Sequence, residues 1–177
     1  KKVTPLSSYG MKTQYKGQIL GCDISSVLSS LDKGDCVVYF GGGRFHYLIL
    51  DVGIPVISAN PYSGDVRDVT EEVKAYRKQR NGLISRAAAG NYFGILVSTR
   101  VGQFNLELAR EIKDRIENKG KRAEIIVSRE IDWEALKNFR RFDVYINTAC
   151  PRIADDWRLA DRPVINPNEL RLLFKLF

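Results

Sequence analysis

The chain contains an internal repeat that restricts its fold to a few architectures. An apolar run begins after Asp35 and again after Asp143, and in both copies a proline follows 20 residues later, at Pro55 and Pro163. Each proline opens the same tripeptide, Pro-Val-Ile, and an Asn-Pro step follows it in both copies. A match of this kind indicates a duplicated unit built from a strand, a loop, a helix and a second strand.

The hydrophobic runs in both copies are continuous rather than alternating, which is typical of parallel strands covered on both faces. We therefore predict an α/β protein of two repeated, small parallel αβα domains. The first copy is expected to start with its second strand, at residues 1–7, so it is incomplete at its N-terminus. The expected parts are a partial domain at 1–69, a linking helix at 70–90 and a complete domain at 91–177.

The second copy predicts its elements most clearly. The expected strands are 93–98, 123–127, 143–148 and 163–165, and the expected helices are 104–120, 131–139 and one that opens after Asn166. The last helix carries a capping box, with Asn166 as the cap, Pro167 at the first helical position and Glu169 three residues after the cap. Thr70 is expected to cap the linking helix.

The composition places the chain among globular proteins that need no covalent cross-links. Its 177 residues are 44% hydrophobic, which is enough for a core. Three cysteines without a CxxC pair indicate a reducing compartment, and we expect a cytoplasmic protein. The most apolar stretch, from Tyr47 to Ile57, is interrupted by Asp51 and Pro55, so no membrane span is expected.

The chain is basic, with 28 Lys and Arg against 21 Asp and Glu and a net charge of +7. Such a balance favours an acidic partner. Much of the charge lies in helices of mixed sign, where pairs such as Arg110 and Asp114 suit a solvated face. We therefore do not expect direct binding to nucleic acid.

Cys22 and Cys150 share a local setting, because each directly precedes a probable helix. Asp23 is expected to cap a helix that runs to Leu31, and Pro151 occupies a favoured first helical position. Free N–H groups at a helix N-terminus stabilise a thiolate and favour soft metals. Each cysteine alone also suits a small buried apolar residue, and Cys36, within an apolar strand, is expected to be core.

Two cysteines far apart in sequence suit an iron-sulfur cluster better than structural zinc, whose ligands come in closely spaced pairs. Two loops at the carboxyl ends of predicted strands are candidates to bind a ligand. The first, Gly41, Gly42, Gly43 and Arg44, offers several backbone N–H groups to an anion, although a tight turn explains the glycines equally well.

The second candidate loop contains Thr99, Arg100 and Gln103. Arg100 is suited to hold a carboxylate, with Thr99 and Gln103 as further hydrogen-bonding groups. Capping of the next helix by Ser98 or Thr99 is the competing explanation. His46 is the only histidine, which excludes catalytic triads and His-rich zinc sites; it is either a hydrogen-bonded structural residue or a polar residue beside the glycine loop.

Five segments together resemble the archaeal diphthamide synthase family, and the likeness spans nearly the whole chain. They are Gly17-Gln18-Ile19-Leu20-Gly21-Cys22-Asp23, Gly41-Gly42-Gly43-Arg44-Phe45-His46, Ala59-Asn60-Pro61-Tyr62, Ser98-Thr99-Arg100-Val101-Gly102-Gln103 and Asn147-Thr148-Ala149-Cys150-Pro151-Arg152. The resemblance implies the second and third of three αβα domains in a homodimer.

The resemblance also implies an activity. In this family three cysteines, one from each domain, hold a 4Fe-4S cluster whose open iron binds S-adenosylmethionine. Reductive cleavage gives a 3-amino-3-carboxypropyl radical that adds to a histidine of translation elongation factor 2, the first step of diphthamide biosynthesis. Cys22 and Cys150 are then the cluster ligands of the second and third domains. The glycine loop with Arg44, and Thr99, Arg100 and Gln103, are candidates to bind the cosubstrate.

The sequence departs from the family pattern in one respect, since no residue corresponds to the cysteine of the first domain. The chain alone is therefore expected neither to hold a full cluster nor to turn over. Two alternatives remain open: a noncatalytic iron-sulfur or partner subunit of the same pathway, and a cluster enzyme similar to quinolinate synthase.

Overall fold

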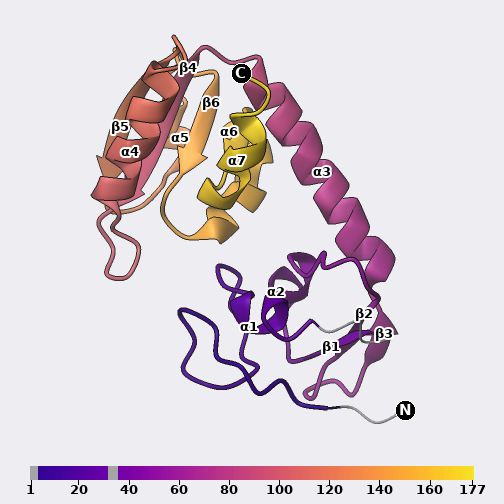
Figure 1. The fold of residues 1–177 in the computed structure, drawn as a ribbon. Coiled ribbons are helices and arrows are strands. Elements are labelled where there is room, and N and C mark those ends of the chain that lie inside the picture. The colour runs from indigo at the N-terminus through magenta and orange to yellow at the C-terminus, as the bar shows by residue number, and fades with distance from the viewer. Residues whose placement is uncertain (1–3, 32–35) are drawn as a thin grey trace. The chain divides into compact units, whose positions relative to one another are not determined.

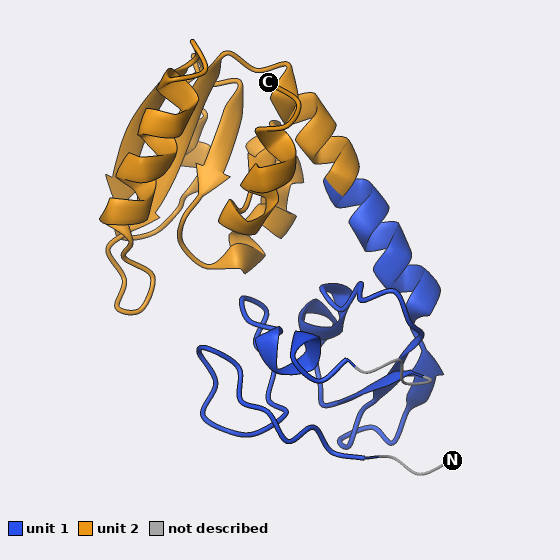
Figure 2. Cartoon of the chain, viewed as in Figure 1, with its two compact units in different colours: residues 1–80 blue, residues 81–177 orange. Residues whose placement is uncertain are grey.

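The structure, a computed structural model, describes residues 4–31 and 36–177. Two compact units make up the chain, residues 1–80 and 81–177 (Figure 2). The boundary between them falls inside the longest helix, α3 (Thr70–Ala88) (Figure 1). In the described part of the chain, no helix combines the length and the apolar character that crossing a membrane requires.

The second unit is built on a four-stranded parallel sheet in the order β5-β4-β6-β7. Its strands are β4 (Tyr92–Ser98), β5 (Arg122–Ser128), β6 (Val144–Asn147) and β7 (Val164–Ile165). Its helices, besides the end of α3, are α4 (Leu106–Glu117), α5 (Trp133–Leu136), the 3-10 turn η1 (Pro151–Asp156), α6 (Trp157–Ala160), the 3-10 turn η2 (Pro167–Glu169) and α7 (Leu170–Leu173). The strand predictions are confirmed to within one residue at either end.

Both faces of this sheet are covered, as continuous apolar strands require. Ile95 and Val97 of β4 point into a core shared with α3, α4 and α7. Leu96, between them, points into the opposite core, which contains Trp133 of α5 and Ala160 of α6. The period of two along the strand therefore sends neighbouring side chains to different layers.

The helices of the second unit are shorter than their apolar patterns predicted. The expected helix at 104–120 begins only at Leu106, because Asn105 caps it by accepting a hydrogen bond from the Leu108 N–H at 3.2 Å. Phe104 remains 55% exposed outside the helix. The helix expected at 131–139 is a single turn, α5. The capping box at Asn166 and Glu169 is confirmed, with Pro167 at the first position.

The first unit is smaller. Its sheet has the order β1-β2-β3, with β1 (Val37–Phe40) parallel to β2 (Val56–Ala59). The helices α1 (Ser25–Leu28) and α2 (Arg44–Leu48) and the start of α3 pack on it around Val27, Leu50, Val56 and Val73. A third strand, β3 (Val66–Asp68), pairs antiparallel with β2. No apolar pattern predicted β3, because its three residues are all exposed.

The internal repeat is visible in the hydrogen bonding of both sheets. Val37 pairs with Val56 in the first unit, and Tyr145 pairs with Val164 in the second. The N–H of Val37 donates to Pro55 O, and the N–H of Tyr145 donates to Pro163 O, each at 2.9 Å. The duplicated motif therefore keeps its strand register. The fold class, α/β with parallel sheets, is confirmed.

Two expectations for the first unit are wrong. Residues 4–7 of the strand expected at 1–7 form no strand, and residues 1–3 lie outside the described part. Cys36 is exposed and precedes β1, so it is not a core residue. The reason is that β1 lies at the edge of its sheet, whereas its repeat counterpart β6 lies between two strands and is buried throughout. Asp35, the start of the first copy, is outside the described residues.

The helix expected after Cys22 and the cap expected at Thr70 also differ from the prediction. The helix after Cys22 is only one turn, α1, and it ends at Leu28 rather than Leu31. The hydroxyl of Thr70 accepts a hydrogen bond from the Val56 N–H at 2.9 Å, so it joins α3 to β2 instead of capping the helix. The N–H of Thr70 itself donates to the Asp68 carboxylate at 2.8 Å.

We predict that Gly94→Ala destabilises the second unit. A Cβ at Gly94 in β4 would lie 2.9 Å from two atoms of the Tyr145 ring and 3.2 Å from Ile126. Overpacking of this kind costs about 1–3 kcal/mol of the free energy of unfolding. Gly82→Ala is the control, because that exposed helical position has free space and should gain about 0.5–1 kcal/mol. Urea denaturation followed by circular dichroism measures both; equal stability of Gly94→Ala and the parent would contradict the packing argument.

Candidate functional site

Cys22 lies at the tip of a tight turn that two backbone hydrogen bonds close. The N–H of Leu20 donates to Asp23 O, and the N–H of Asp23 donates to Leu20 O, both at 2.9 Å. The thiol at this tip is exposed and free. The turn therefore presents the sulfur to solvent on a constrained backbone.

The Asp23 carboxylate organises the chain on both sides of this turn. It accepts hydrogen bonds from the N–H of Ser25 at 2.9 Å and from the N–H of Lys12 at 2.6 Å. Burial raises the pKa of Asp23, but hydrogen bonds from the Ser25 hydroxyl and from the Ser25 and Lys12 backbones outweigh it, so the pKa lies below its usual value. The expectation that Asp23 is the N-cap of the helix is wrong, because Ile24 holds that position. The Asp23 carboxylate still accepts from the first helical N–H, that of Ser25. A helix of four residues contributes little field, so the closed turn, rather than a helix N-terminus, presents the thiol.

The Cys22 turn is in direct contact with Phe45, a residue of the helix that follows the glycine loop. A Cβ built on Gly21 would lie 1.7 Å from Cε1 of Phe45, so the ring of Phe45 fills the space that any other residue at position 21 would need. Phe45 belongs to α2, the helix that begins directly after the glycine loop. The Cys22 turn and the start of α2 therefore lie side by side in the first unit.

The glycine loop follows β1 and continues its hydrogen bonding for one residue, with Gly41 N–H donating to Ala59 O at 3.0 Å. Gly43 has φ of 94°, a left-handed conformation that favours glycine. The Tyr39 hydroxyl donates a hydrogen bond to Gly42 O at 2.7 Å, and this bond restrains the loop. In the described part of the chain, the Gly42 and Gly43 N–H groups have no acceptor, so both remain available to a ligand.

Arg44, the fourth predicted residue of this loop, forms an ion pair with Glu72 of α3. Glu72 also accepts a hydrogen bond from the Tyr47 hydroxyl at 3.1 Å. The Arg44 side chain is 68% exposed, so the pair is screened by water and worth little to stability. Arg44 can therefore exchange Glu72 for a ligand anion at small cost.

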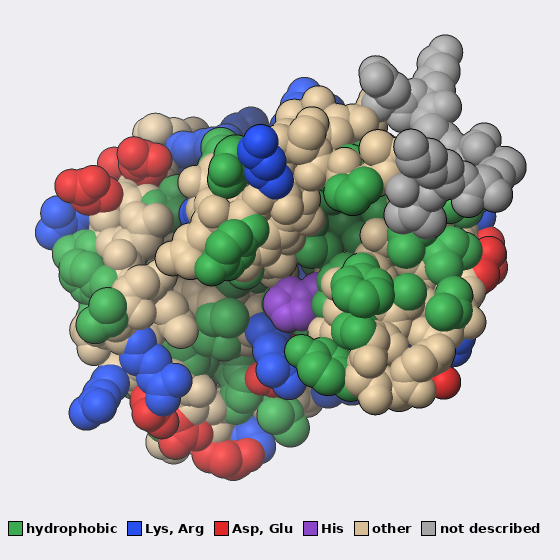
Figure 3. Space-filling model, turned by 90° about the horizontal axis from the view of Figure 1, so that it is seen from below, with side chains coloured by type: hydrophobic (Ala, Val, Ile, Leu, Met, Phe, Trp, Pro, Cys, Tyr) green, Lys and Arg blue, Asp and Glu red, His purple; other side chains and the backbone are tan. Residues whose placement is uncertain are grey.

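His46 carries the one buried side-chain polar atom that has no hydrogen-bond partner among the described residues, its Nδ1. The expectation of a hydrogen-bonded structural histidine is therefore wrong. Its ring lies 5.6 Å from that of Phe45 and 6.5 Å from that of Tyr39, measured between centroids. The side chain is half-buried and reaches the surface (Figure 3). An unpaired buried nitrogen beside the glycine loop is consistent with the alternative, a polar residue of the site.

Cys150 occupies the predicted setting at the other candidate site. It follows β6, sits at the N-cap of η1, and is followed by Pro151 at the first helical position. The thiol is free and half-buried. The helical segment is a 3-10 turn rather than an α-helix, so hydrogen bonds to the loop, more than a helix dipole, hold the residue in place.

A pair of buried asparagines supplies those hydrogen bonds. The Asn147 amide donates to Cys150 O at 2.9 Å and to Asn166 Oδ1 at 2.8 Å, and it accepts from Ala149 N–H at 3.1 Å. Asn166 in turn donates to Pro151 O at 3.1 Å. From the sequence, Asn166 is expected only as a helix cap, and no role is expected for Asn147. The signal that identifies Asn147 is an amide at the end of an apolar strand, where a buried polar group needs partners.

The loop after β4 contains the remaining predicted residues. Ser98 accepts from Arg100 N–H at 3.2 Å and donates to Arg129 O at 2.9 Å, and Gln103 N–H donates to Arg100 O at 3.0 Å. Neither Ser98 nor Thr99 caps α4, so that competing explanation is wrong. The Arg100 guanidinium already holds a carboxylate, that of Glu130, at 2.5 Å.

The structure brings some of these residues together. In the first unit the Cys22 turn contacts Phe45 of α2, the helix that follows the glycine loop. In the second unit the Arg100 loop and the Cys150 loop both begin where the strands end at their carboxyl termini. The strands β4 and β6 that precede them are parallel neighbours, and Thr148 N–H donates to Leu96 O at 3.0 Å. Within the described ranges, no group of three His, Cys, Asp or Glu residues is placed to hold a metal ion.

Comparison with known proteins assigns the chain to a family. The family model described as "Putative diphthamide synthesis protein" matches residues 1–176. The chain belongs to the diphthamide synthesis family. The 2-(3-amino-3-carboxypropyl)histidine synthase of Pyrococcus horikoshii is 30% identical over 93% of the chain and 47% of its own length. Subunit 1 of the corresponding synthase from Caenorhabditis elegans is 34% identical over 87% of the chain and 39% of its own length.

A solved structure agrees with this assignment. Dph2 from Pyrococcus horikoshii, described with a 4Fe-4S cluster, superimposes with a TM-score of 0.76 at 29% identity. The match covers 91% of the chain and 46% of Dph2. The chain thus spans less than half the length of these relatives, and it shares their α/β fold over that span.

The chain carries the type of ligand that an iron-sulfur cluster needs. Thiolates are the usual ligands of such clusters, and Cys22 and Cys150 are free thiols held on loops by the contacts described above. The fit in number is partial, because these two cysteines supply only two ligands. Cys36, the third cysteine, is exposed and precedes β1, and it is close to neither Cys22 nor Cys150 in the sequence.

We predict that Asn147→Ala loosens the Cys150 loop. The substitution leaves the Ala149 N–H without its acceptor and removes a hydrogen-bond donor from Cys150 O and from Asn166 Oδ1, which should cost about 2–4 kcal/mol of the free energy of unfolding. Hydrogen exchange at the Ala149 amide should become faster. The control, Asn138→Ala, changes an exposed asparagine and should alter stability by less than about 0.5 kcal/mol. Unchanged exchange at Ala149 would show that Asn147 does not hold the loop.

We also predict that Gly21→Ala destabilises the first unit by about 1–3 kcal/mol, because the new methyl group collides with the Phe45 ring. In a Phe45→Ala background the same substitution should be close to neutral. Denaturation of the four proteins in this double-mutant cycle measures the coupling between the two positions. Additive effects would mean that Phe45 is not what excludes a side chain at position 21.

Proposed function

We propose that this chain is part of an enzyme that transfers the 3-amino-3-carboxypropyl group of S-adenosylmethionine to a histidine of translation elongation factor 2. This is the first step of diphthamide biosynthesis. Membership of the diphthamide synthesis family is the observation that carries the proposal. Its relatives are named as synthases of 2-(3-amino-3-carboxypropyl)histidine, the product of such a transfer.

In this proposal Cys22 and Cys150 are two of the thiolate ligands of a 4Fe-4S cluster, and further ligation comes from residues beyond these 177. When bound, the cluster supplies the electron that cleaves the sulfonium of S-adenosylmethionine and yields a 3-amino-3-carboxypropyl radical. The two closed loops hold the sulfurs in fixed positions. Such preorganisation lowers the entropic cost of binding a cluster.

The chain's own residues have separate tasks around that centre. We assign the free Gly42 and Gly43 N–H groups, with Arg44, to an anionic group of the cosubstrate. We assign Arg100 to its carboxylate, assisted by Thr99 and Gln103. The Arg100–Glu130 pair is exposed on both sides, 51% and 65%, so its exchange for a ligand carboxylate costs little.

The partners follow from the same proposal. Elongation factor 2 is the protein substrate, and the enzyme is a homodimer in the cytoplasm, where translation factors act. A noncatalytic iron-sulfur or partner subunit of the pathway is the second candidate, favoured by the two cysteines being fewer than a complete ligand set. The alternative similar to quinolinate synthase loses its support, because the family model matches the chain almost end to end.

The test is anaerobic reconstitution of the chain with ferrous iron, sulfide and an excess of 2-mercaptoethanol, which can supply a missing thiolate. We expect the absorption of a 4Fe-4S cluster, and we expect Cys22→Ala and Cys150→Ala each to lose most of the bound iron. Cys36→Ala is the matched control, since it removes a free thiol that is exposed like that of Cys22 and should leave iron binding unchanged. Equal losses in all three variants would contradict the assignment of the ligands.

A second measurement separates the two candidate functions. Cleavage of S-adenosylmethionine by the reconstituted chain in the presence of dithionite supports the transferase. Because the chain alone is expected not to turn over, a cluster that depends on Cys22 and Cys150 without any cleavage supports the noncatalytic subunit only when the missing ligand domain of the family is supplied together with the chain.

A further inference from the structure

Tyr62 has the highest exposed fraction of the aromatic side chains that the structure describes, 89%. It lies in the loop that joins β2 to β3, directly after the Asn60-Pro61 step. Within the described residues, its ring packs against no other ring or cation, and its hydroxyl has no hydrogen-bond partner. An exposed ring contributes little to folding, because the hydrophobic free energy scales with the area that is buried. Packing therefore does not explain a tyrosine at this position.

Hydrogen bonds close the loop that carries Tyr62. The N–H of Asn60 donates to Asp65 O at 2.8 Å, and the N–H of Gly64 donates to Asn60 O at 2.9 Å. The Asn60 side chain accepts from the Tyr62 N–H at 2.9 Å. Pro61 restricts a further backbone torsion. The backbone at Tyr62 is therefore held in place, and only its two side-chain torsions remain for a ligand to order.

The Tyr62 ring lies against the glycine loop. A Cβ built on Gly42 would lie 3.4 Å from Cδ2 and 3.5 Å from Cε2 of Tyr62. One side of the ring makes this contact, and the remainder of the ring is open to solvent. The strands β1 and β2 are parallel neighbours, so the glycine loop and the Tyr62 loop both follow the carboxyl ends of their strands. Ligands of parallel sheets bind at this edge.

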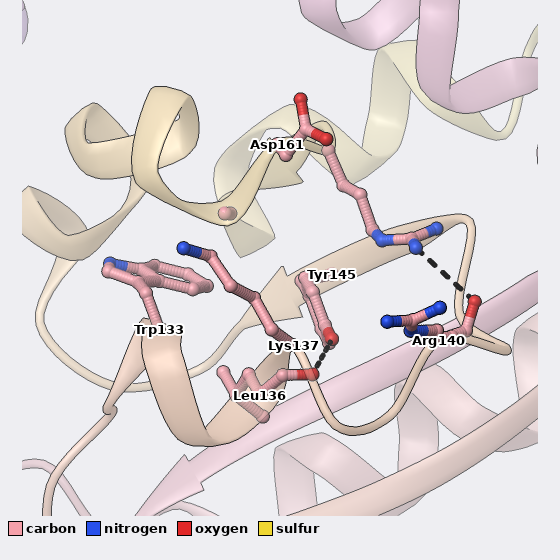
Figure 4. Close-up of a pocket in the computed structure, with 8 residues that line it drawn as sticks. Trp133, Leu136, Lys137, Arg140, Tyr145 and Asp161 are labelled. Atoms are coloured by element: carbon pink, nitrogen blue, oxygen red, sulfur yellow. Dashed lines mark hydrogen bonds between the residues drawn. The ribbon is translucent and has the colours of Figure 1, made fainter.

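The aromatic rings at a cavity of the second unit are engaged in a different way. Trp133 and Tyr145 line that cavity and are 7% and 2% exposed. The Tyr145 hydroxyl donates to Leu136 O at 3.2 Å, and the Arg162 guanidinium donates to Arg140 O at 3.3 Å (Figure 4). These rings serve packing, whereas the face of Tyr62 is free to contact a ligand.

We propose that Tyr62 binds the adenine base of the cosubstrate by stacking. This inference rests on the proposed function, which supplies an adenosine-containing cosubstrate. Adenine is planar, and stacking on an aromatic ring requires an exposed ring face but no hydrogen-bond partner. The closed loop lowers the conformational entropy that is lost when the base binds. Tyr62 is thus a binding residue for the base and takes no part in the transfer itself.

The test is an NMR titration of the whole chain, without iron, with methylthioadenosine, which carries the adenosine half of the cosubstrate. The ring current of Tyr62 should move the signals of the adenine protons upfield. Tyr62→Ala should abolish this shift and weaken binding about tenfold, a loss typical of one base stacked on an aromatic ring. Tyr62→Phe keeps the ring and should retain both the shift and the affinity.

Tyr15→Ala is the matched control. It removes another exposed tyrosine of the first unit, 69% exposed, and should bind methylthioadenosine as the parent does. Substitutions at such exposed positions should leave the fold intact.

Three results would overturn the proposal. They are no binding of methylthioadenosine at millimolar concentration, equal affinity and equal ligand shifts in Tyr62→Ala and the parent, and an equal loss in Tyr62→Phe and Tyr62→Ala. Failure of this inference is distinct from failure of the proposed function. Iron binding is assigned to Cys22 and Cys150, so Tyr62→Ala should bind iron on reconstitution as the parent does.

Discussion

The parallel pairing of β6 with β4 and β7 is the constraint on which the rest of the second unit depends. A strand buried on both faces uses its side chains for packing, so chemically active groups must lie beyond its ends. Asn147 marks this transition. It is the last residue of β6, fully buried, and its amide hydrogen bonds connect the sheet to the Cys150 loop. The position of the thiol is thus set by the sheet.

In the first unit the same motif has weaker support. β1 has the register of β6 but lies at the edge of a three-stranded sheet, and its residues are at best half-buried. An edge strand shields one side only, which explains why Cys36 is exposed although an apolar run follows it. In place of a central strand, the ring of Phe45 braces the Cys22 turn through Gly21. The two cysteines are therefore held by different contacts, and Cys22 lies ahead of the duplicated segment, whereas Cys150 lies within it.

The predictable features are those that local patterns encode. Apolar runs located β4, β5 and β6, and the residue order around Asn166 specified its capping box, because both depend on neighbours in sequence. The missed features depend on contacts between distant residues. The strand β3 is exposed and has no apolar signature, and Thr70 bonds to Val56 across the fold. At the candidate sites the sequence located the cysteines and loops, but the pairing of Asn147 with Asn166 and the contact of Phe45 with Gly21 required coordinates.

The shortness of the helices after both cysteines changes the physical account of these sites. The sequence suggested that helix N-termini stabilise the thiolates, but α1 has four residues and η1 is a 3-10 turn. Aligned peptide dipoles sum to a useful field only over longer helices. What both sites share instead is a backbone closed by hydrogen bonds: a reciprocal pair around Cys22 and an asparagine network around Cys150. A ligand held in this way gains affinity because little conformational freedom remains to be lost when a metal binds.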